Sequence, residues 1–308
     1  MLSLRRDRVT ASPLRPAPME WEGYYSIYDD DLPAMSAVSD KFMPFAGQIA
    51  GHHTEMKNGV LQVGFLKELE NHGWLLKPAQ DGKRGQREIG FYEELWNSLD
   101  VRFDLIKMFI PNFKGMRTVE YGGEAVRCLE IEDITYKYKM PASIDIKIGK
   151  RTYGPDASAE KIRKESGKYP PQETKGFRIL GYKIAAHHDL KRERSREWGI
   201  SLAEEELIGA LEEFVAHRED ASEVATEIVR QLCGIRAVSE SGLYHFYSSS
   251  VLICYEADKN RRPSVDIRMI DFSHVHDGKG EPDNNYLFGL NNLIDMFSTI
   301  AGMPKSAL

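Results

Sequence analysis

The strongest constraint on the fold is the stretch from Pro141 to Gly149, in which charged residues alternate with isoleucines. Three isoleucines flank Asp145 and Lys147 with the period of a β-strand. This period puts both charged side chains on one face and the isoleucines on the other. A charge that faces an interior is costly unless it is paired. The charged face therefore predicts either a ligand site or a buried structural ion pair.

The same stretch carries a recognisable motif. Its pattern Pro-x-x-x-Asp-x-Lys-x-Gly resembles the signature of the inositol polyphosphate kinase family, and all four fixed positions match. Short motifs also occur by chance, so an ordinary strand with an ion pair stays an alternative for these nine residues alone. The resemblance extends from about Pro44 to the end of the chain, and the other motifs decide between the two interpretations.

Length and composition indicate an ordinary globular protein. The 308 residues are 42% hydrophobic and 29% charged, enough for one large core or two lobes. No apolar run approaches the length of a membrane span, so we expect no transmembrane segment. The three cysteines are odd in number and scattered, which favours a reducing compartment without disulfides.

Charge is unevenly distributed along the chain. The net charge is −6, yet residues 150–196 contain 13 Lys and Arg against 6 Asp and Glu, a local charge of +7. A basic patch on an acidic protein attracts a compact polyanion while the rest of the surface repels nucleic acid. A solvated charged face is the alternative. We expect a small polyanionic partner and no nucleic acid.

The pattern of elements predicts two lobes after an N-terminal tail. We expect the tail at residues 1–35, a small lobe at 36–134 with an antiparallel sheet and one helix, and a larger lobe at 135–308. The expected small-lobe elements are strands at 48–51, 73–77, 117–121 and 126–134, a hairpin turn at Asn58-Gly59 and a helix from Glu88 to Leu99. The expected large-lobe elements are a short helix ending by Gly167, a strand at 176–186, a charged loop at 187–196, helices at 201–217, 221–233 and 285–300, and a strand at 265–271.

Lys77 ends a strand, and Glu88 lies in the helix that follows. Kinase-like folds use such a pair to hold a lysine against nucleotide phosphates. A solvated lysine at a sheet edge is the alternative. Neither a Gly-x-Gly-x-x-Gly loop nor a Gly-x-x-x-x-Gly-Lys-Ser/Thr loop occurs in the sequence.

Two further motifs suit a phosphorylated substrate and its metal. Asp271 ends an apolar strand and opens the segment Asp-Phe-Ser-His274, a usual way to present a Mg²⁺ ligand, although a turn aspartate is the alternative. Lys161, Lys164 and Lys168 recur at i, i+3 and i+7 on a short basic helix, which suits several phosphates. A solvated helix face is again the alternative.

The resemblance implies an α+β, two-lobed kinase-like fold, related to the protein-kinase and ATP-grasp folds, that uses ATP and Mg²⁺. It implies Asp145, Lys147 and Lys77 as catalytic residues, of which Lys77 binds the ATP phosphates with Glu88 as its partner. The remaining implied roles are adenine binding at the backbone of Glu132 and Ile134, ribose binding by Asp145, Mg²⁺ binding by Asp271, contact of Lys147 with the γ-phosphate and the attacking hydroxyl, and substrate-phosphate binding by Arg84, Lys161, Lys164, Lys168 and His274.

Within the family, the segment after the signature is most similar to the multikinase branch. That branch implies phosphorylation of inositol tris- and tetrakisphosphates toward the pentakisphosphate, with phosphoinositide headgroups as an additional substrate class. A hexakisphosphate kinase and a catalytically silent scaffold of the same fold are the alternatives. Family membership further implies a monomer in the cytoplasm and nucleus.

Overall fold

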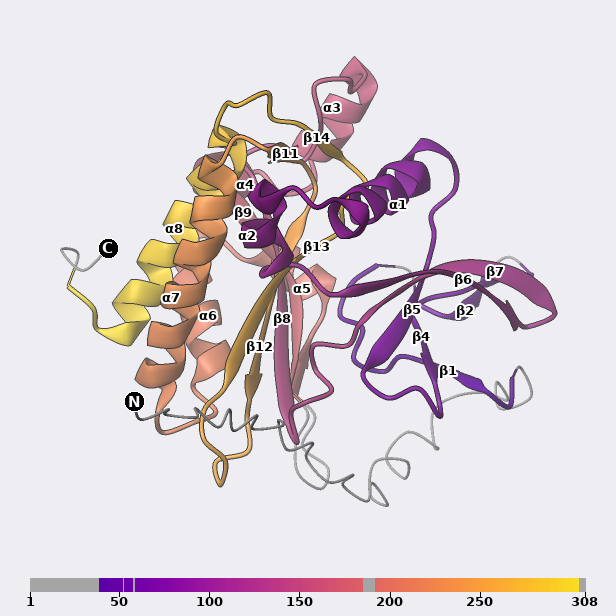
Figure 1. The fold of residues 1–308 in the computed structure, drawn as a ribbon. Coiled ribbons are helices and arrows are strands. Elements are labelled where there is room, and N and C mark those ends of the chain that lie inside the picture. Colours follow the sequence, from indigo (N-terminus) through magenta and orange to yellow (C-terminus); the bar gives the residue numbers. More distant parts are fainter. Residues whose placement is uncertain (1–38, 52, 58, 185–191, 305–308) are drawn as a thin grey trace, which may run out of the picture. The chain divides into compact units, whose positions relative to one another are not determined.

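A computed structural model describes residues 39–51, 53–57, 59–184 and 192–304, and the expected tail at 1–35 lies outside them. The first sheet is antiparallel, in the order β1-β4-β5-β7-β6 (Figure 1). Its strands are β1 (Phe42–Pro44), β4 (Leu66–Glu68), β5 (Trp74–Pro78), β7 (Glu124–Glu132) and β6 (Phe113–Tyr121). A separate hairpin pairs β2 (Glu55–Lys57) with β3 (Val60–Gln62), as expected, although Asn58 lies outside the described residues.

The second sheet is also antiparallel, in the order β10-β9-β8-β12-β13. Its strands are β10 (Arg192–Arg194), β9 (Phe177–Ile184), β8 (Pro141–Ile148), β12 (Ser250–Glu256) and β13 (Val265–Ile270), and a small ribbon pairs β11 (Tyr244–Phe246) with β14 (Val275–Asp277). The predicted division at residue 134 falls in the connection between β7 of the first sheet and β8 of the second.

Helices cover one face of the second sheet. Figure 1 shows α6 (Leu207–Val215), α7 (Ala221–Glu240) and α8 (Asn284–Ala301) along this face, where the three isoleucines of β8 are fully buried in the main hydrophobic core. The other helices are α1 (Gly82–Asn97), α2 (Asp104–Lys107), α3 (Ala159–Ser166), α4 (Pro171–Lys175) and α5 (Arg196–Ser201), with 3₁₀ turns η2 (Val101–Phe103) and η4 (Glu204–Glu206). Within the described residues, no helix is long and apolar enough to cross a membrane.

Helix α1 links the two sheets through its aromatic side chains. The ring of Tyr92 lies 5.1 Å from Phe113 of β6 and 5.5 Å from Phe272, which follows β13. Phe91 lies 4.3 Å from the same Phe272 ring. These contacts fix the helix between the end of β13 and the first sheet, and so fix the position of Glu88 one turn before them.

Several element predictions were wrong. Residues 48–51 form a loop, because the side chain of Gln48 bonds the Ala50 carbonyl and the Phe65 N–H in place of a strand partner. Ser201 ends α5 and opens no helix, because Leu202 is extended and the carboxylate of Glu206 accepts from the Ala203 N–H before α6 begins.

Three boundaries also differ from the prediction. Helix α1 begins at Gly82, six residues before the expected start, and α7 continues to Glu240 instead of ending at Cys233. Part of the expected loop at 187–196 is the edge strand β10, which pairs with β9. The polar first turns of α1 and the paired, charged β10 lack the apolar periodicity on which the prediction depended.

Candidate functional site

Strand β8 presents its charged residues as the sequence predicts. Asp145 lies opposite Leu252 of β12, and Lys147 lies opposite Ser250, so both charges share the sheet face that turns away from α6–α8. Among the described residues no ion pair joins the two: the Lys147 ammonium donates to the Ser248 carbonyl at 2.6 Å, and Asp145 Oδ1 is buried without a partner. The alternative of a simple structural ion pair is therefore wrong.

Lys77 is held by two carboxylates that are distant in sequence. Its Nζ lies 2.6 Å from Glu88 Oε1 of α1 and 2.7 Å from Asp271 Oδ1, just past the end of β13. Glu88 Oε1 also accepts the Phe272 N–H at 3.1 Å. The side chains of Lys77 and Glu88 are 9% and 0% exposed, so the alternative of a solvated edge lysine is wrong.

Burial and charge set the protonation of this cluster. Burial alone would lower the pKa of Lys77, but Asp271 and Glu88 outweigh it and raise the pKa, so this lysine is charged. Partial burial would raise the pKa of Asp271, but Lys77 and Lys147 lower it. Burial and the neighbouring Asp271 raise the pKa of Asp145 to about 6. Burial lowers the pKa of Lys147, although Asp271 and Asp145 act in the opposite direction.

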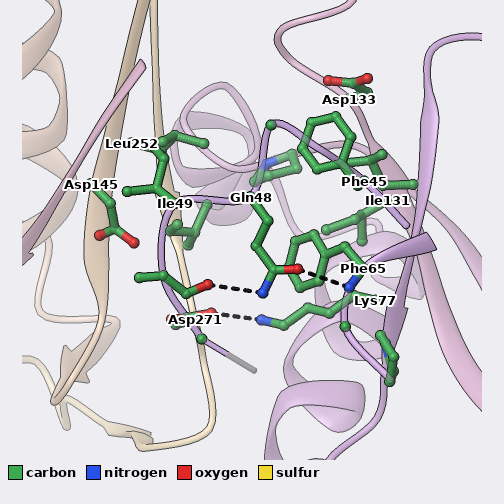
Figure 2. Close-up of a pocket in the computed structure, with 18 of the residues that line it drawn as sticks. Phe45, Gln48, Ile49, Phe65, Lys77, Ile131, Asp133, Asp145, Leu252 and Asp271 are labelled. Atoms are coloured by element: carbon green, nitrogen blue, oxygen red, sulfur yellow. Dashed lines mark hydrogen bonds and ion pairs between the residues drawn. The ribbon is translucent and has the colours of Figure 1, made fainter. Parts of the chain in front are cut away.

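A cleft of about 520 Å³ opens beside this cluster. In Figure 2, aromatic side chains of Phe45 and Phe65 face Leu252 and Asp145 across it, and Lys77 extends toward Asp271. The lining includes six residues predicted from the sequence: Lys77, Arg84, Glu132, Ile134, Asp145 and Asp271. The volume and the mixture of apolar walls with a few charges are typical of a small-molecule site.

In the segment that connects β7 to β8, one residue that lines the cleft has unbonded backbone groups. Among the described residues, neither the N–H nor the carbonyl of Ile134 takes part in a hydrogen bond. The Glu132 N–H is already donated to the Asn112 carbonyl, and the Asp133 N–H to the Gly73 carbonyl. Of these three residues, Ile134 is therefore the one whose backbone N–H is free to bind a ligand in the cleft. The Glu132 N–H is not available.

A second cluster of positive charge gathers around His274. Burial and the charges of Lys161, Arg84 and Arg87 lower the pKa of His274 to about 4, although Asp156 acts in the opposite direction. Ser158 caps α3 by accepting the Lys161 N–H. The other two predicted lysines differ: Lys168 pairs with Glu165 at 2.6 Å, and Lys164 is exposed.

Sequence reasoning missed Arg87 and Asp156, whose side chains are paired at 2.8 Å across α1 and the segment before α3. Arg87 follows Arg84 by one helical turn, so helical spacing was the signal that could have found it. Asp156 precedes the N-cap Ser158 by two residues, where an aspartate in sequence alone is equally typical of a helix cap.

Among the described residues, nine buried polar side-chain atoms have no hydrogen-bond partner. Six of them belong to the charged face of the second sheet or to the two clusters: Glu88 Oε2, Asp145 Oδ1, Ser250 Oγ, Arg178 Nε, His274 Nδ1 and His276 Nε2. The other three are His217 Nε2, Tyr244 Oη and Tyr286 Oη. Buried polar groups are normally hydrogen-bonded, and functional sites are where exceptions accumulate. A polar ligand is the partner that this arrangement lacks.

Replacing Glu88 by alanine tests how far the buried ion pair stabilises the fold. We expect the free energy of unfolding to fall by about 3 kcal/mol, because Lys77 keeps one partner and the Phe272 N–H loses its acceptor. Urea denaturation measures the change. Glu93→Ala on the exposed side of the same helix is the control and should change it by less than about 0.5 kcal/mol. Equal effects of the two substitutions would contradict the assignment.

The sequence of this chain is similar to known proteins of one family. The profile of the family described as inositol polyphosphate kinase matches residues 128–298. Inositol polyphosphate multikinase alpha of Arabidopsis thaliana is 31% identical over 287 residues, covering 84% of this chain and 96% of the relative. Inositol hexakisphosphate kinase 1 of Mus musculus is 30% identical over 59% of this chain and 53% of its own length.

A solved structure has the same fold. The inositol phosphate multikinase of S. cerevisiae, in complex with ADP and Mn²⁺, superposes with a TM-score of 0.62 at 22% identity, covering 74% of this chain and 99% of that chain. The two-lobed α+β kinase-like fold expected from the sequence is thereby confirmed. The family profile matches more than half of the chain, and the alignment with the Arabidopsis relative covers 96% of that relative. The protein therefore belongs to the inositol polyphosphate kinase family.

Proposed function

We propose that this chain is an ATP-dependent inositol polyphosphate multikinase, which phosphorylates inositol tris- and tetrakisphosphates toward the pentakisphosphate. The observation that carries the proposal is the convergence of Lys77, Asp145 and Asp271 on one cleft, with Lys147 next to Asp145 on the same sheet face. The yeast structure with ADP and Mn²⁺ and the name of the Arabidopsis relative support the nucleotide and the substrate class.

The cleft suits a nucleotide whose base enters between the apolar walls. The free peptide of Ile134, with the Glu132 carbonyl, is the proposed adenine site. Asp145 lines the cleft and is the proposed acceptor for the ribose hydroxyls, and its buried Oδ1 has no hydrogen-bond partner among the described residues. Lys77, fixed by Glu88, is the proposed contact to the ATP phosphates.

The donor set also fits a divalent cation. Mg²⁺ takes oxygen ligands and needs one or two protein carboxylates when phosphates and water supply the rest. Asp271, with its side chain 41% exposed, fits this need, and Asp145 is the neighbouring carboxylate. In the described part of the chain no cluster of three His, Cys, Asp or Glu side chains could hold a metal by itself. When bound with the nucleotide, the cation supplies positive charge to the phosphates.

The basic cluster around His274 is the proposed site for the acceptor's phosphates. Arg84, Lys161 and His274 lie together there. Lys164 lies in α3 with Lys161, and Lys168 follows the end of that helix. Lys147 lies two residues from Asp145 on β8, and its ammonium bonds the Ser248 carbonyl, next to Tyr247, whose N–H bonds the His274 carbonyl. In this position it can neutralise charge on the transferred group. Phosphoryl transfer demands positioning and charge neutralisation more than covalent chemistry, so we assign Lys147 this role and do not require Asp145 as general base.

The direct test is purified protein with Mg-ATP and a panel of inositol phosphates, with the products separated by anion-exchange chromatography. Conversion of tris- and tetrakisphosphates to pentakisphosphate would support the proposal. Conversion of hexakisphosphate alone would favour the second candidate, a hexakisphosphate kinase, to which the mouse relative points. No turnover would favour a silent scaffold, and a parallel assay with phosphoinositide vesicles tests the lipid headgroup as substrate.

A pH effect should accompany acceptor binding. Burial and neighbouring positive charges keep the pKa of His274 near 4. A bound polyanion offsets the positive charges and raises this pKa, so the histidine should take up a proton. At pH 6 we expect wild type to take up about half a proton more per binding event than His274→Gln. Calorimetry of inositol hexakisphosphate binding in two buffers of different ionisation enthalpy measures this difference. Equal uptake by the two proteins would place the polyanion away from His274.

A further inference from the structure

Arg178 is a buried charged residue to which neither the mechanism nor the sequence motifs assign a role. It lies on β9 directly opposite Lys147 of β8, so its side chain shares the face that carries Asp145 and Lys147. The residue is only 3% exposed. Its Nε has no hydrogen-bond partner, and no carboxylate of the described residues lies within ion-pair distance of its guanidinium.

Arg218, a second deeply buried arginine, has hydrogen-bond acceptors for all three nitrogens of its guanidinium. Arg218 is 5% exposed, and its guanidinium bonds both carboxylate oxygens of Asp220 and the carbonyls of Glu256, Asp258 and Arg261. A buried guanidinium remains charged, and leaving it unpaired is costly. Arg178 has no partner of this kind among the described residues, so its position is explained by an anion that these residues do not supply.

The charged groups around Arg178 do not neutralise it. The nearest acid toward α3 is Glu165, whose carboxylate is already bound by Lys168 and Thr152. Burial and the positive charge of Arg196 lower the pKa of Arg178, with Glu165 and Asp145 acting in the opposite direction. Arg196 opens α5 and is exposed, so a second cation stands near the buried one.

The order of strands shows on which side of Lys147 the anion would bind. Along one row of the second sheet lie Arg178, Lys147, Ser250 and Ile270, and Asp271 follows Ile270. Arg178 is thus at the opposite end of the row from the nucleotide residue Asp271, and it is not among the residues that line the nucleotide cleft. The anion therefore belongs to the acceptor.

We propose that Arg178 binds a phosphate of the inositol polyphosphate, on the ring carbon next to the hydroxyl that Lys147 contacts. The inference rests on the proposed function. Cross-strand neighbours lie about 5 Å apart at Cβ, so the charged ends of Lys147 and Arg178 can reach two neighbouring substituents of one six-membered ring. A guanidinium binds phosphate with two parallel hydrogen bonds. Arg178 then selects substrates that carry a phosphate at this position.

The test compares wild type with Arg178→Met over a panel of inositol tris- and tetrakisphosphate isomers. We expect kcat/KM to fall about tenfold or more for isomers with the selected phosphate and to stay within about twofold for an isomer without it. The KM for ATP should not change. Arg230→Met, which removes an exposed arginine of α7, is the charge-matched control and should leave every ratio unchanged.

Other outcomes overturn the inference. An equal fall for all isomers would make Arg178 a support for α3, and a raised KM for ATP alone would assign it to the nucleotide. If Arg178→Met does not fold, Arg178→Lys is measured on the same panel. Lysine cannot make the bidentate contact with phosphate, so the fall in kcat/KM should again depend on the isomer. Wild type is assayed first: if it phosphorylates no inositol phosphate, the proposed function fails, and if it does while the variant matches it, only this inference fails.

Discussion

Lys147→Met should reduce kcat/KM for an inositol tetrakisphosphate by about 10³-fold while leaving the protein folded. The ammonium of Lys147 is near the carboxylates of Asp145 and Asp271, and its hydrogen bond to the Ser248 carbonyl fixes its position. Methionine keeps the packing of the aliphatic stem and removes only the charge. Steady-state kinetics with saturating ATP, together with a thermal melt, measure both parts of the expectation.

Lys150→Met is the matched control for this substitution. Lys150 lies three residues further along, is exposed, and rests 5.4 Å from the ring of Phe288. It should change kcat/KM by less than about threefold, since a single exposed charge outside the site contributes little. A Lys147→Met protein that keeps more than a tenth of the activity would remove Lys147 from phosphoryl transfer and leave the nucleotide residues to carry it.

The parts of the site that the sequence predicted are those encoded by local patterns. The alternation around Asp145 and Lys147 is a property of one strand, and its buried isoleucines follow from the period alone. The order of strand, Lys77, helix and Glu88 is likewise local. The structure adds that Asp271, 194 residues from Lys77, closes the same cluster, which the sequence suggested only through the family resemblance.

What the sequence could not predict depends on contacts between distant segments. Arg178 lies in a run of apolar residues, where one arginine is expected to face solvent, and only its pairing with β8 shows that it is buried beside Lys147. Lys168 is an exception, because it pairs with Glu165 three residues earlier, a local contact that the sequence spacing could have shown. The residues 48–51 have strand propensity, yet no neighbouring strand is placed to pair with them.

Asp271→Asn should reduce kcat by about 10³-fold and abolish the effect of Mg²⁺ on ATP binding. Asp271 adopts a left-handed backbone conformation with φ of +67°, which asparagine tolerates as well as aspartate does, so the fold should survive. Its side-chain amide oxygen can still accept from Lys77, while Glu88 keeps the lysine paired. What is lost is the carboxylate charge that a hard cation needs.

Thermal melts separate the metal from the nucleotide in this variant. In wild type, ATP with Mg²⁺ should raise Tm by more than ATP with a chelator, because ligands that bind only the folded state stabilise it in proportion to their affinity. Asp271→Asn should show the smaller shift under both conditions. Asp295→Asn, on the exposed side of α8, is the control and should behave like wild type. If Asp271→Asn kept the additional Mg²⁺-dependent shift, the cation would bind elsewhere. Asp145 is the carboxylate to test next, because burial and the neighbouring charge of Asp271 together raise its pKa to about 6, which shows that the two carboxylates are close.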